Sequence, residues 1–296
     1  MKNMSKYSIK DLEKITGVKA HTIRIWERRY GIIQPERSKT NIRSYSDSDL
    51  RKLLNISMLN SSGIKISHLA KLSSIDLEAK ILELSRSSKS IGFHIEKLTL
   101  ATVNFNEELF ESILSKCVLE SGMESTITDV LFPFFERIGV LWQVGSISPA
   151  QEHFISNLIR QKLFASIDSL SGKSLEGASK VLIYLKEGEL HEVGILFYNY
   201  ILRRNGYSTL YLGQDLPFKD LKNAVNDYNP DYIISSFISP INPEDINAYL
   251  INMEKSFEGK TIMITGLQLK QDGVVVPNSM DLITSPQKFK DLLQLK

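Results

Sequence analysis

Cysteine is nearly absent from this chain of 296 residues, in which Cys117 is the one thiol. A single cysteine excludes an internal disulfide framework and a zinc site built from cysteines. Long apolar runs are missing as well, because no stretch of about 18 residues is apolar enough to span a bilayer. The first residues, MKNMSKYSIKDLEK, lack the apolar core of a signal peptide. These absences predict a cytoplasmic protein with no membrane partner.

The net charge of +2 hides an uneven distribution of charge along the chain. Residues 1–75 contain nine Lys and six Arg against six Asp and Glu, a net charge of +9, whereas residues 76–296 carry a net charge of −7. A basic region joined to an acidic body is typical of proteins that bind a polyanion. The alternative is a surface whose charges carry no function, and only specific motifs can separate the two interpretations.

Residues 1–75 are predicted to form a small domain of short helices with a wing. Ser8 can cap a first helix, which Gly17 ends, and a second helix follows at once. The segment GIIQPERSKTNIRSYS has the turn-forming and β-branched residues of a wing. Residues 76–95 contain the polar run SRSSKS and are predicted to be a linker.

Residues 96–176 and residues 177–296 differ in their hydrophobic rhythm. The first region has apolar residues at helical spacing, as in FNEELFESILSKCVL, which predicts a bundle of about four helices. The second alternates helical segments with short apolar ones, and the predicted strands are KVLIYL, STLYLG, DYIISSF, TIMITG and VVVP. Such alternation predicts a Rossmann-like, doubly wound parallel sheet. The predicted fold class is therefore multidomain α and α/β, with a winged helix-turn-helix head, a helical bundle and a parallel sheet.

The segment VKAHTIRIWERRYG is the candidate recognition helix. Its N-terminal residues are expected to reach the major groove, its arginines to bind phosphates or bases, and two wing residues to touch the DNA backbone. The N-terminal residues are Lys19, His21 and Thr22, the arginines are Arg24, Arg28 and Arg29, and the wing residues are Arg43 and Tyr45. Glu27 is expected to pair with a basic neighbour. The alternative is a surface helix that is merely rich in Lys and Arg.

The head resembles the MerR family closely. The strings TGV and HTIRIWERRYGI, and the arginine and tyrosine of NIRSYSDSDL, stand where that family has its helix-turn-helix and wing. The resemblance covers residues 5–73 and implies binding of a double-stranded DNA operator. Many members have a glycine before the Arg-x-Tyr segment of the wing, whereas this chain reads SKTNIRSY.

The string GELHEVG, residues 188–194, is the most informative one in the second half of the chain. It follows a predicted strand and opens a helix, so His191 is expected on a loop at the carboxyl edge of the sheet, where ligands bind in such folds. An imidazole there can coordinate a transition metal, and Glu189 could accept the proton of its other ring nitrogen. Gly194 would let a flat ligand approach the start of the helix. Taken alone, a loop histidine is more often simply solvated.

The string also resembles the Asp/Glu-x-His-x-x-Gly signature of cobalamin-binding Rossmann-like domains. The resemblance implies that His191 is the lower ligand of cobalt and that the nucleotide tail of the cofactor inserts between strands. It places Ser235, with Ser236 as the alternative, and Gly266 beside that tail. Thr265 stands where the family has the first of two glycines. The segment YLGQD, residues 211–215, is expected to form the loop after the second strand.

A second set of residues lies in the predicted bundle, where Trp142 precedes Glu152 and His153 by ten residues. Relatives that sense light through adenosylcobalamin carry this arrangement, and the resemblance implies that the three residues cover the upper, adenosyl face of the corrin. An indole can stack on such a face, and the two polar side chains can bind sugar hydroxyls. Gln143 follows Trp142, where some relatives have a histidine. The alternative is that Trp142 is a core residue and that the other two are surface residues.

The order of the three parts is that of the CarH/LitR group of light-dependent regulators. The resemblance implies a transcription regulator, a repressor by analogy and no enzyme, that senses adenosylcobalamin and, through photolysis, light. It also implies a homo-dimer or homo-tetramer that brings several heads onto repeated operator sites.

Two other functions are compatible with parts of the sequence. The first is a MerR-type regulator whose sensor no longer needs cobalamin, which Thr265 and Gln143 favour. The second is a corrinoid methyl carrier of the kind found in methionine synthase-type proteins. A DNA-binding head argues against the second.

Overall fold

The computed structural model describes residues 7–37, 41–77, 79–80, 91–143, 147–172 and 175–295. The chain divides into two compact units, 1–157 and 158–296, and each unit is described by itself. The sequence instead predicts a boundary after residue 176. The second half of the last bundle helix accounts for the difference, because its Phe164 packs edge-on against Tyr211 of the sheet at 6.4 Å between ring centroids.

The head begins with two helices, α1 (Ile9–Thr16) and α2 (Ala20–Tyr30), whose ends match the sequence-based prediction. Ser8 and Asp11 form a capping box at the start of α1, and Gly17 ends the helix in a left-handed conformation with φ 71°. The short strands β1 (Glu36–Arg37) and β2 (Arg43–Ser44) form the wing. Two further helices, α3 (Asp47–Ser61) and α4 (Ile66–Leu69), complete the head.

In the wing, an asparagine adopts the left-handed backbone conformation that a glycine would favour. Asn41 adopts a left-handed conformation with φ 61° just before β2, and its side chain accepts a hydrogen bond of 2.7 Å from Arg37 Nη1. Asparagine tolerates this backbone region better than most residues do. The two-residue strands therefore pair although no glycine precedes the Arg-x-Tyr segment.

The bundle contains the four predicted helices, α6 (Ile91–Val103), α7 (Glu107–Ser125), α8 (Phe132–Gln143) and α9 (Pro149–Asp168). The predicted linker, residues 76–95, overlaps helix at both ends, because residues 74–77 are helical and α6 begins at Ile91; residues 81–90 lie outside the described part. The division into 1–75, 76–95, 96–176 and 177–296 stays a prediction.

Pro133 is the second residue of α8. The six residues before this helix form a wider π-helical turn, η1 (Thr126–Leu131), in which the amide of Phe132 donates to the carbonyl of Ile127. A proline ring crowds the preceding turn of a regular α-helix, and the wider turn makes room for it. Pro133 therefore lies where the winding changes from π to α, in a helical segment that continues across this point.

The second unit is built on a parallel sheet with the strand order β4-β3-β5-β6-β7. The strands are β3 (Lys180–Lys186), β4 (Ser208–Leu216), β5 (Tyr232–Ser236), β6 (Thr261–Thr265) and β7 (Met280–Leu282). The order reverses between β3 and β5, so the carboxyl ends of these two strands flank the crevice in which doubly wound sheets bind ligands.

Two details of the predicted sheet are wrong. The fifth strand is β7, not VVVP (274–277), because the amide of Val275 donates to Asn247 Oδ1 instead of to a strand and Pro277 has no amide to donate. The segment YLGQD (211–215) is not a loop but part of β4, which is bulged against β3 at this point.

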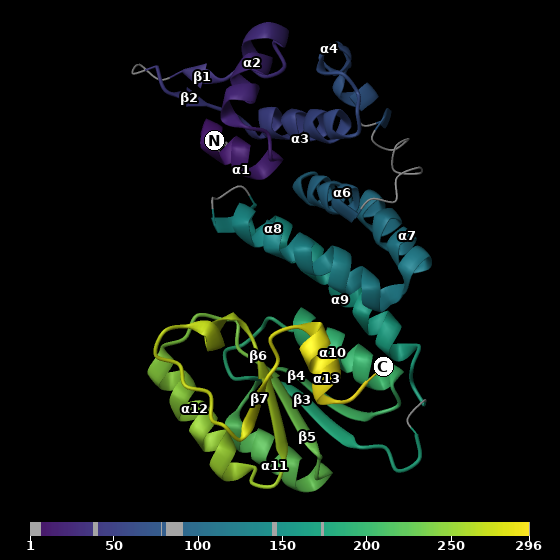
Figure 1. The fold of residues 1–296 in the computed structure, drawn as a ribbon, viewed down its shortest axis with the longest axis vertical. Helices are drawn as coiled ribbons and strands as arrows, with labels where there is room; N and C mark the ends of the chain where they lie inside the picture. The colour runs from purple at the N-terminus through teal and green to yellow at the C-terminus, as the bar shows by residue number, and fades with distance from the viewer. Residues whose placement is uncertain are drawn as a thin grey trace. The chain divides into compact units, whose positions relative to one another are not determined.

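Helices cover both faces of the sheet (Figure 1). One face carries α10 (Val193–Arg204) and α13 (Pro286–Leu292), which meet where Tyr198 and Phe289 pack at 4.4 Å between centroids. The other carries α11 (Phe218–Tyr228) and α12 (Pro243–Ser256), whose apolar residues form one core with the inward-facing residues of the strands. A short 3₁₀ turn, η2 (Leu267–Lys270), follows β6. No helix in the described ranges is long and apolar enough to cross a bilayer.

Candidate functional site

The recognition helix α2 presents its basic residues to solvent and packs Ile23 and Trp26 into the core. The candidate groove and phosphate contacts Lys19, His21, Arg24, Arg28 and Arg29 are exposed, and Thr22 is partly exposed. Ile23 and Trp26 are buried. The surface of α2 is therefore basic and available to a polyanion.

Glu27 is the centre of a polar cluster that joins α2 to the wing, which confirms the expectation that it pairs with a basic neighbour. Its two carboxylate oxygens accept hydrogen bonds of 3.2 Å from Arg43 Nε, and Oε2 accepts another of 3.2 Å from the Tyr45 hydroxyl. Arg37 Nη2 lies 3.6 Å from Oε1. The cluster fixes the wing against the recognition helix.

Tyr45 requires a correction. Its side chain is only 1% exposed, so it is a core residue of the head and does not present a surface to the DNA backbone. Burial first, and then the charge of Glu27, raise the pKa of the phenol to about 12, so it remains a hydrogen-bond donor. Arg43 is partly exposed and keeps its predicted role as a candidate DNA contact.

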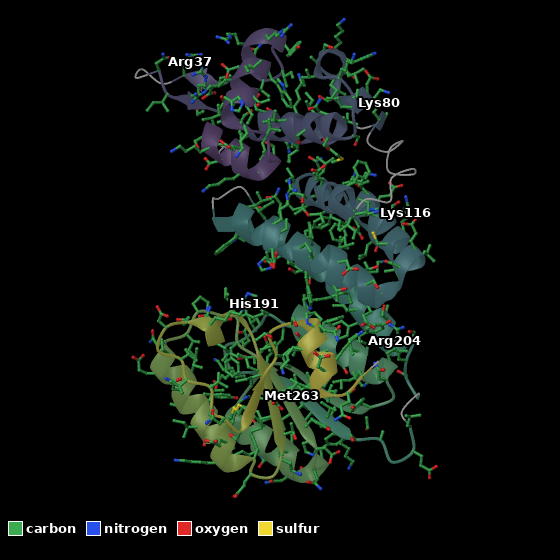
Figure 2. The ribbon with its side chains drawn as sticks, in the orientation of Figure 1. Arg37, Lys80, Lys116, His191, Arg204 and Met263 are labelled. Carbon is green, nitrogen blue, oxygen red and sulfur yellow. The ribbon has the colours of Figure 1, made fainter. Side chains whose placement is uncertain are left out.

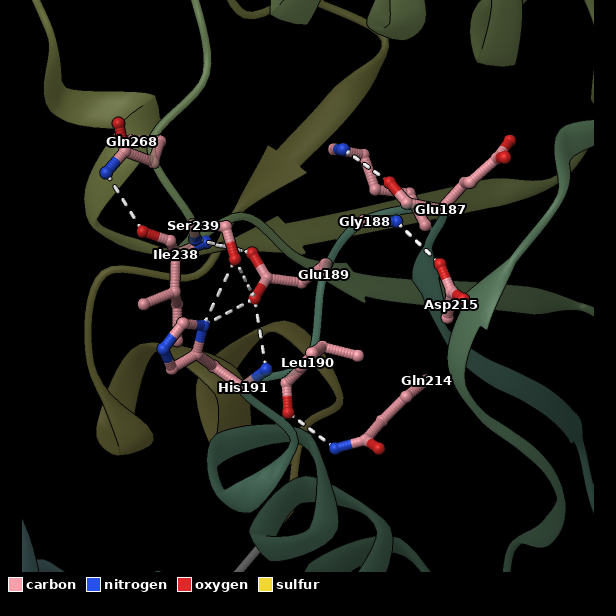
Figure 3. A network of polar contacts seen from close by, with 11 residues as sticks. Glu187, Gly188, Glu189, Leu190, His191, Gln214, Asp215, Ile238, Ser239 and Gln268 are labelled. Carbon is pink, nitrogen blue, oxygen red and sulfur yellow. Dashed lines mark hydrogen bonds and ion pairs between the residues drawn. The ribbon is translucent and has the colours of Figure 1, made fainter. Parts of the chain in front are cut away.

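The second site lies on the loop between β3 and α10, at the carboxyl edge of the sheet, where His191 was expected (Figure 2). The side chain of His191 is 55% exposed, whereas that of Glu189 is completely buried. The His191 Nδ1 atom lies 2.7 Å from Glu189 Oε1 and 3.2 Å from the Ser239 hydroxyl. Figure 3 shows the second ring nitrogen on the side of the imidazole that faces away from Glu189.

The carboxylate of Glu189 is held by the loop that follows β5. Its Oε2 accepts hydrogen bonds of 2.6 and 2.7 Å from the amides of Ile238 and Ser239, and its Oε1 accepts one of 2.8 Å from the Ser239 hydroxyl. Burial alone would raise the pKa of Glu189, but the bonds from His191 and from these backbone amides outweigh it and lower the pKa to about 2. Glu189 is therefore an anion at neutral pH.

An ionised carboxylate can only accept hydrogen bonds, so we assign the imidazole proton to Nδ1 of His191. Nε2 is then the basic nitrogen of the ring, the atom through which an imidazole in this tautomer can coordinate a metal. Ser239, which sequence reasoning missed, completes this arrangement. It could have been found, because a small polar residue directly after a parallel strand lies at the same edge of the sheet as His191.

Further contacts hold the loop that carries His191. The amide of Gly188 donates to Asp215 Oδ1 at 2.8 Å, and Gln214 donates to the carbonyl of Leu190 (Figure 3). Leu190 and Leu267 are both exposed apolar residues on loops at this edge of the sheet. An exposed apolar surface beside an oriented imidazole suits a flat ligand with an apolar face.

The two glycines of the predicted site have different environments. A Cβ atom at Gly194 would meet open space, so packing within the chain does not require glycine there. A Cβ atom at Gly266 would lie 2.1 Å from the carbonyl oxygen of Phe237. Gly266 is therefore required by the close approach of the segment after β5, whether or not a ligand binds beside it.

Ser235 and Ser236 are both buried, but they face opposite sides of the sheet. Ser235 is in register with Tyr184, whose side chain belongs to the core under α11 and α12. Its Oγ has no hydrogen-bond partner among the described residues, although it lies close enough to Tyr184 to lower the pKa of that phenol. Ser236 is in register with Thr265, which contacts Tyr198 of α10. Ser236 therefore shares the face of the sheet that bears Gly194.

Thr265 occupies the place of the first family glycine. Its hydroxyl donates a hydrogen bond of 2.9 Å to the carbonyl of Ile283, so the side chain links β6 to the end of β7. The threonine is thus part of the sheet edge.

The three candidate residues of the bundle are on its surface. Trp142, at the end of α8, is 55% exposed, which argues against the alternative of a core tryptophan. Glu152 and His153 lie in the first turns of α9, with 3.4 Å between Glu152 Oε2 and His153 Nδ1. Ser156 donates a hydrogen bond of 2.6 Å to Glu152 Oε1. All three side chains are accessible to a ligand.

The described residues contain no group of three or more His, Cys, Asp and Glu that could hold a metal ion. A metal bound through His191 would thus have one protein ligand and would have to bring its other ligands with it. A cobalt that sits in a macrocycle meets this condition.

Comparisons with known proteins agree with this geometry. Residues 7–74 match the MerR HTH family regulatory protein model, and residues 94–165 match the B12 binding domain model. The chain is 29% identical over 257 residues to the HTH-type transcriptional repressor CarH of Myxococcus xanthus, covering 84% of this chain and 85% of the relative. It is 25% identical over 265 residues to the repressor CarA of the same organism, covering 89% and 87%.

A solved structure supports the fold of the remaining part. The monomethylamine corrinoid protein of Methanosarcina barkeri superposes with a TM-score of 0.52 at 15% identity, covering 69% of this chain and 99% of that one. At this identity the likeness shows the fold alone. Residues 7–74 are therefore similar to the MerR HTH family and residues 94–165 to the B12 binding domain, in a chain that aligns over most of its length with the CarH and CarA repressors.

Proposed function

We propose that this protein is a transcription regulator, and not an enzyme, that binds operator DNA through its head and senses cobalamin through its C-terminal half. The observation that carries the proposal is the orientation of His191 by the buried, ionised Glu189, in a chain whose head is of the MerR type. Adenosylcobalamin is the proposed form, and repression the proposed effect on transcription. The names and the alignments of the CarH and CarA repressors support repression. The resemblance of Trp142, Glu152 and His153 to the arrangement in light-sensing relatives supports adenosylcobalamin.

The basic face of α2 supports DNA binding. Arg24, Arg28 and Arg29 would bind phosphates or bases, and Lys19, His21 and Thr22 would face the major groove. Each phosphate that a lysine or arginine neutralises gives a slope of about −0.9 in a plot of log affinity against log salt. Arg28→Ala is therefore expected to reduce the slope by about 1, whereas Tyr45→Phe should leave it unchanged. Equal slopes for Arg28→Ala and the parent protein would contradict the assignment of Arg28.

The residues at the sheet edge fit a corrinoid. His191 would bind cobalt through Nε2, with Glu189 and Ser239 fixing the ring, and Leu190 would lie against the apolar surface of the ligand. Gly194, Ser235 or Ser236, and Gly266 are the proposed contacts of the nucleotide tail, and the face that Ser236 shares with α10 favours Ser236. Trp142, Glu152 and His153 are the proposed contacts of the other face. Bound adenosylcobalamin supplies a cobalt–carbon bond that green light breaks, which would make the regulator light-dependent.

Two finer features complete the proposal. Homo-dimers or homo-tetramers would present several heads to repeated operator sites and so gain affinity by effective concentration. A cytoplasmic location follows from the DNA partner and from the single cysteine of the chain.

The test uses the purified protein and adenosylcobalamin in darkness. We expect a change in the visible spectrum on binding, a larger species by size-exclusion chromatography, and loss of both after green light. An unchanged spectrum and size would exclude the light-sensing function.

A second candidate is a regulator that works without cobalamin, and Thr265 at the place of a family glycine favours it. His191→Ala distinguishes the two. Loss of cobalamin binding together with loss of DNA regulation supports the cobalamin sensor, whereas unchanged regulation supports the second candidate.

A further inference from the structure

The loop that carries His191 is flanked by two buried carboxylates whose partners are in different parts of the fold. Glu189, two residues before His191, is bound by the loop after β5. Glu192, directly after His191, is only 4% exposed and does not bind that loop. Its side chain also forms no capping hydrogen bond with α10, although its backbone occupies the N-cap position. Glu192 must therefore be explained by its other contacts.

Two groups hold the Glu192 carboxylate. The guanidinium of Arg160, on α9, forms an ion pair with Oε1, and the hydroxyl of Tyr211, on β4, donates a hydrogen bond to Oε2. Burial first, and then Glu192, raise the pKa of Tyr211, so the phenol keeps its proton and remains a donor. The carboxylate thus connects the end of the His191 loop to both α9 and the edge strand of the sheet.

The same helix carries residues of the proposed sensor. Glu152 and His153 lie eight and seven residues before Arg160 on α9, about 12 Å along a helix axis. Phe164, one turn after Arg160, packs against the ring of Tyr211. One polar and one aromatic contact therefore hold the C-terminal half of α9 against β4.

This ion pair is buried on the Glu192 side and partly exposed on the Arg160 side. It is a weak source of stability, because the cost of removing the carboxylate from water offsets much of the attraction. An apolar pair would hold α9 against β4 at least as well. A charged pair instead fixes the relative position of the groups, since guanidinium and carboxylate pair only in defined geometries. This argument favours a role in positioning over a role in stability.

We propose that Glu192 is a positioning residue that, through Arg160 and Tyr211, couples the His191 loop to α9. The proposal rests on the proposed function. A displacement of His191, such as loss or gain of its metal bond, is then passed directly to the helix that carries Glu152 and His153. A displacement of α9 changes in turn the position of the imidazole.

The test compares Glu192→Gln with a matched control, Arg203→Gln. Arg203 also bonds to β4, at Thr209, but at the opposite end of that strand from the His191 loop. In the protein without cobalamin, Glu192→Gln is expected to speed amide hydrogen exchange about tenfold at residues 188–191 and at residues 158–166. With adenosylcobalamin in darkness, it should lower affinity about tenfold and alter the visible spectrum, because the loop that carries His191 loses its contacts with Arg160 and Tyr211. Arg203→Gln should change neither region nor the spectrum.

Tyr211→Phe is a milder variant, because it removes one donor without leaving a charge unpaired, and it is used if Glu192→Gln does not fold. Its exchange should rise in the same two regions by a smaller factor. Unchanged exchange and spectrum in a folded Glu192→Gln or Tyr211→Phe variant would overturn the proposal, and so would equal changes in Arg203→Gln. If the parent protein binds no cobalamin, the proposed function fails, while the exchange measurement still decides whether Glu192 couples the two segments.

Discussion

Glu189 in the sheet unit and Lys97 in the bundle are both charged residues that are almost completely buried, but their surroundings differ. Glu189 accepts hydrogen bonds from three backbone amides, a hydroxyl and an imidazole, and its pKa falls to about 2. Lys97 is 1% exposed, has no carboxylate partner among the described residues, and has its Nζ 4.3 Å from the centroid of the Phe93 ring. Burial first, and then the charge of Lys116, lower its pKa to about 8.

The pKa values of Glu189 and Lys97 are both lowered, but the two shifts have opposite effects on the charged form of the side chain. A lowered pKa stabilises the charged form of an acid and destabilises the charged form of a base. The fold therefore supports the charge of Glu189 and opposes that of Lys97. A buried charge that accepts several hydrogen bonds marks a candidate functional site. A buried charge without such bonds lowers the stability of the fold.

The largest effect is expected at the supported charge. Glu189→Gln replaces an acceptor with an amide that cannot accept from all five donors, so the free energy of unfolding should fall by about 3 kcal/mol. Adenosylcobalamin affinity should fall by about 10- to 100-fold, because the His191 ring loses its orientation. Denaturant unfolding and absorbance titration measure the two effects.

Glu187→Gln is the matched control, since Glu187 is exposed and lies two residues earlier. Affinity equal to that of the parent protein in Glu189→Gln would show that the His–Glu contact does not serve ligand binding.

Lys97 should give an effect of the opposite direction. Lys97→Met removes a charge that the fold opposes and keeps an apolar chain of similar length, so it should stabilise the protein by about 2 kcal/mol at pH 7. The folded pKa lies below the unfolded value of about 10.4, so the folded state releases its proton first. The advantage of Lys97→Met should therefore be complete below pH 8 and should disappear as the pH rises from about 8 to about 10.4.

Thermal unfolding at pH 7 and pH 10 measures this difference. Lys162→Met, at a partly exposed lysine of α9, is the control, because Lys162 does not contribute to the lowered pKa of Lys97. A difference between Lys97→Met and the parent protein that does not depend on pH would show that packing, and not charge, accounts for it.

Glu27 in the head is intermediate, because it is mostly buried and has Arg43 and Tyr45 as partners. Glu27→Gln should lower the free energy of unfolding by about 1 kcal/mol, less than Glu189→Gln, since its donors are side chains that can turn to water. Chemical denaturation measures it, with the exposed Glu36→Gln as the control. If Glu27→Gln lowered the free energy of unfolding as much as Glu189→Gln does, Glu27 and Glu189 would not differ in how strongly the fold stabilises their charge.

Much of the fold could be read from periodicity and from residues that end helices. Ser8, Gly17 and Gly31 mark the ends of the first two helices because their effect is local. The VVVP segment could not be placed, because three valines favour a strand and only the tertiary contact between Val275 and Asn247 decides otherwise. The face of Ser235 depends on strand register, which is not local either.

The site was predicted in part for the same reason. His191 and Glu189 are close in sequence, so their pairing follows from the spacing of the motif. Ser239, Arg160 and Tyr211 come from three distant segments, and their convergence appears only in the fold. Tyr45 was misplaced because a tyrosine among basic residues suggests a surface, while its register with Tyr7 buries it.

The burial of Tyr45 has a consequence for how the regulator reads DNA. Its backbone exchanges two hydrogen bonds of 2.9 Å with Tyr7, and its hydroxyl meets the acidic side chain of the recognition helix. These contacts fix the recognition helix and the wing against each other in the absence of DNA, so little conformational entropy is lost when the head binds an operator. Such a rigid head is poorly suited to regulation by a conformational change within the head itself. A change in the number of heads that an assembly contains suits its regulation better than a change in the conformation of each head.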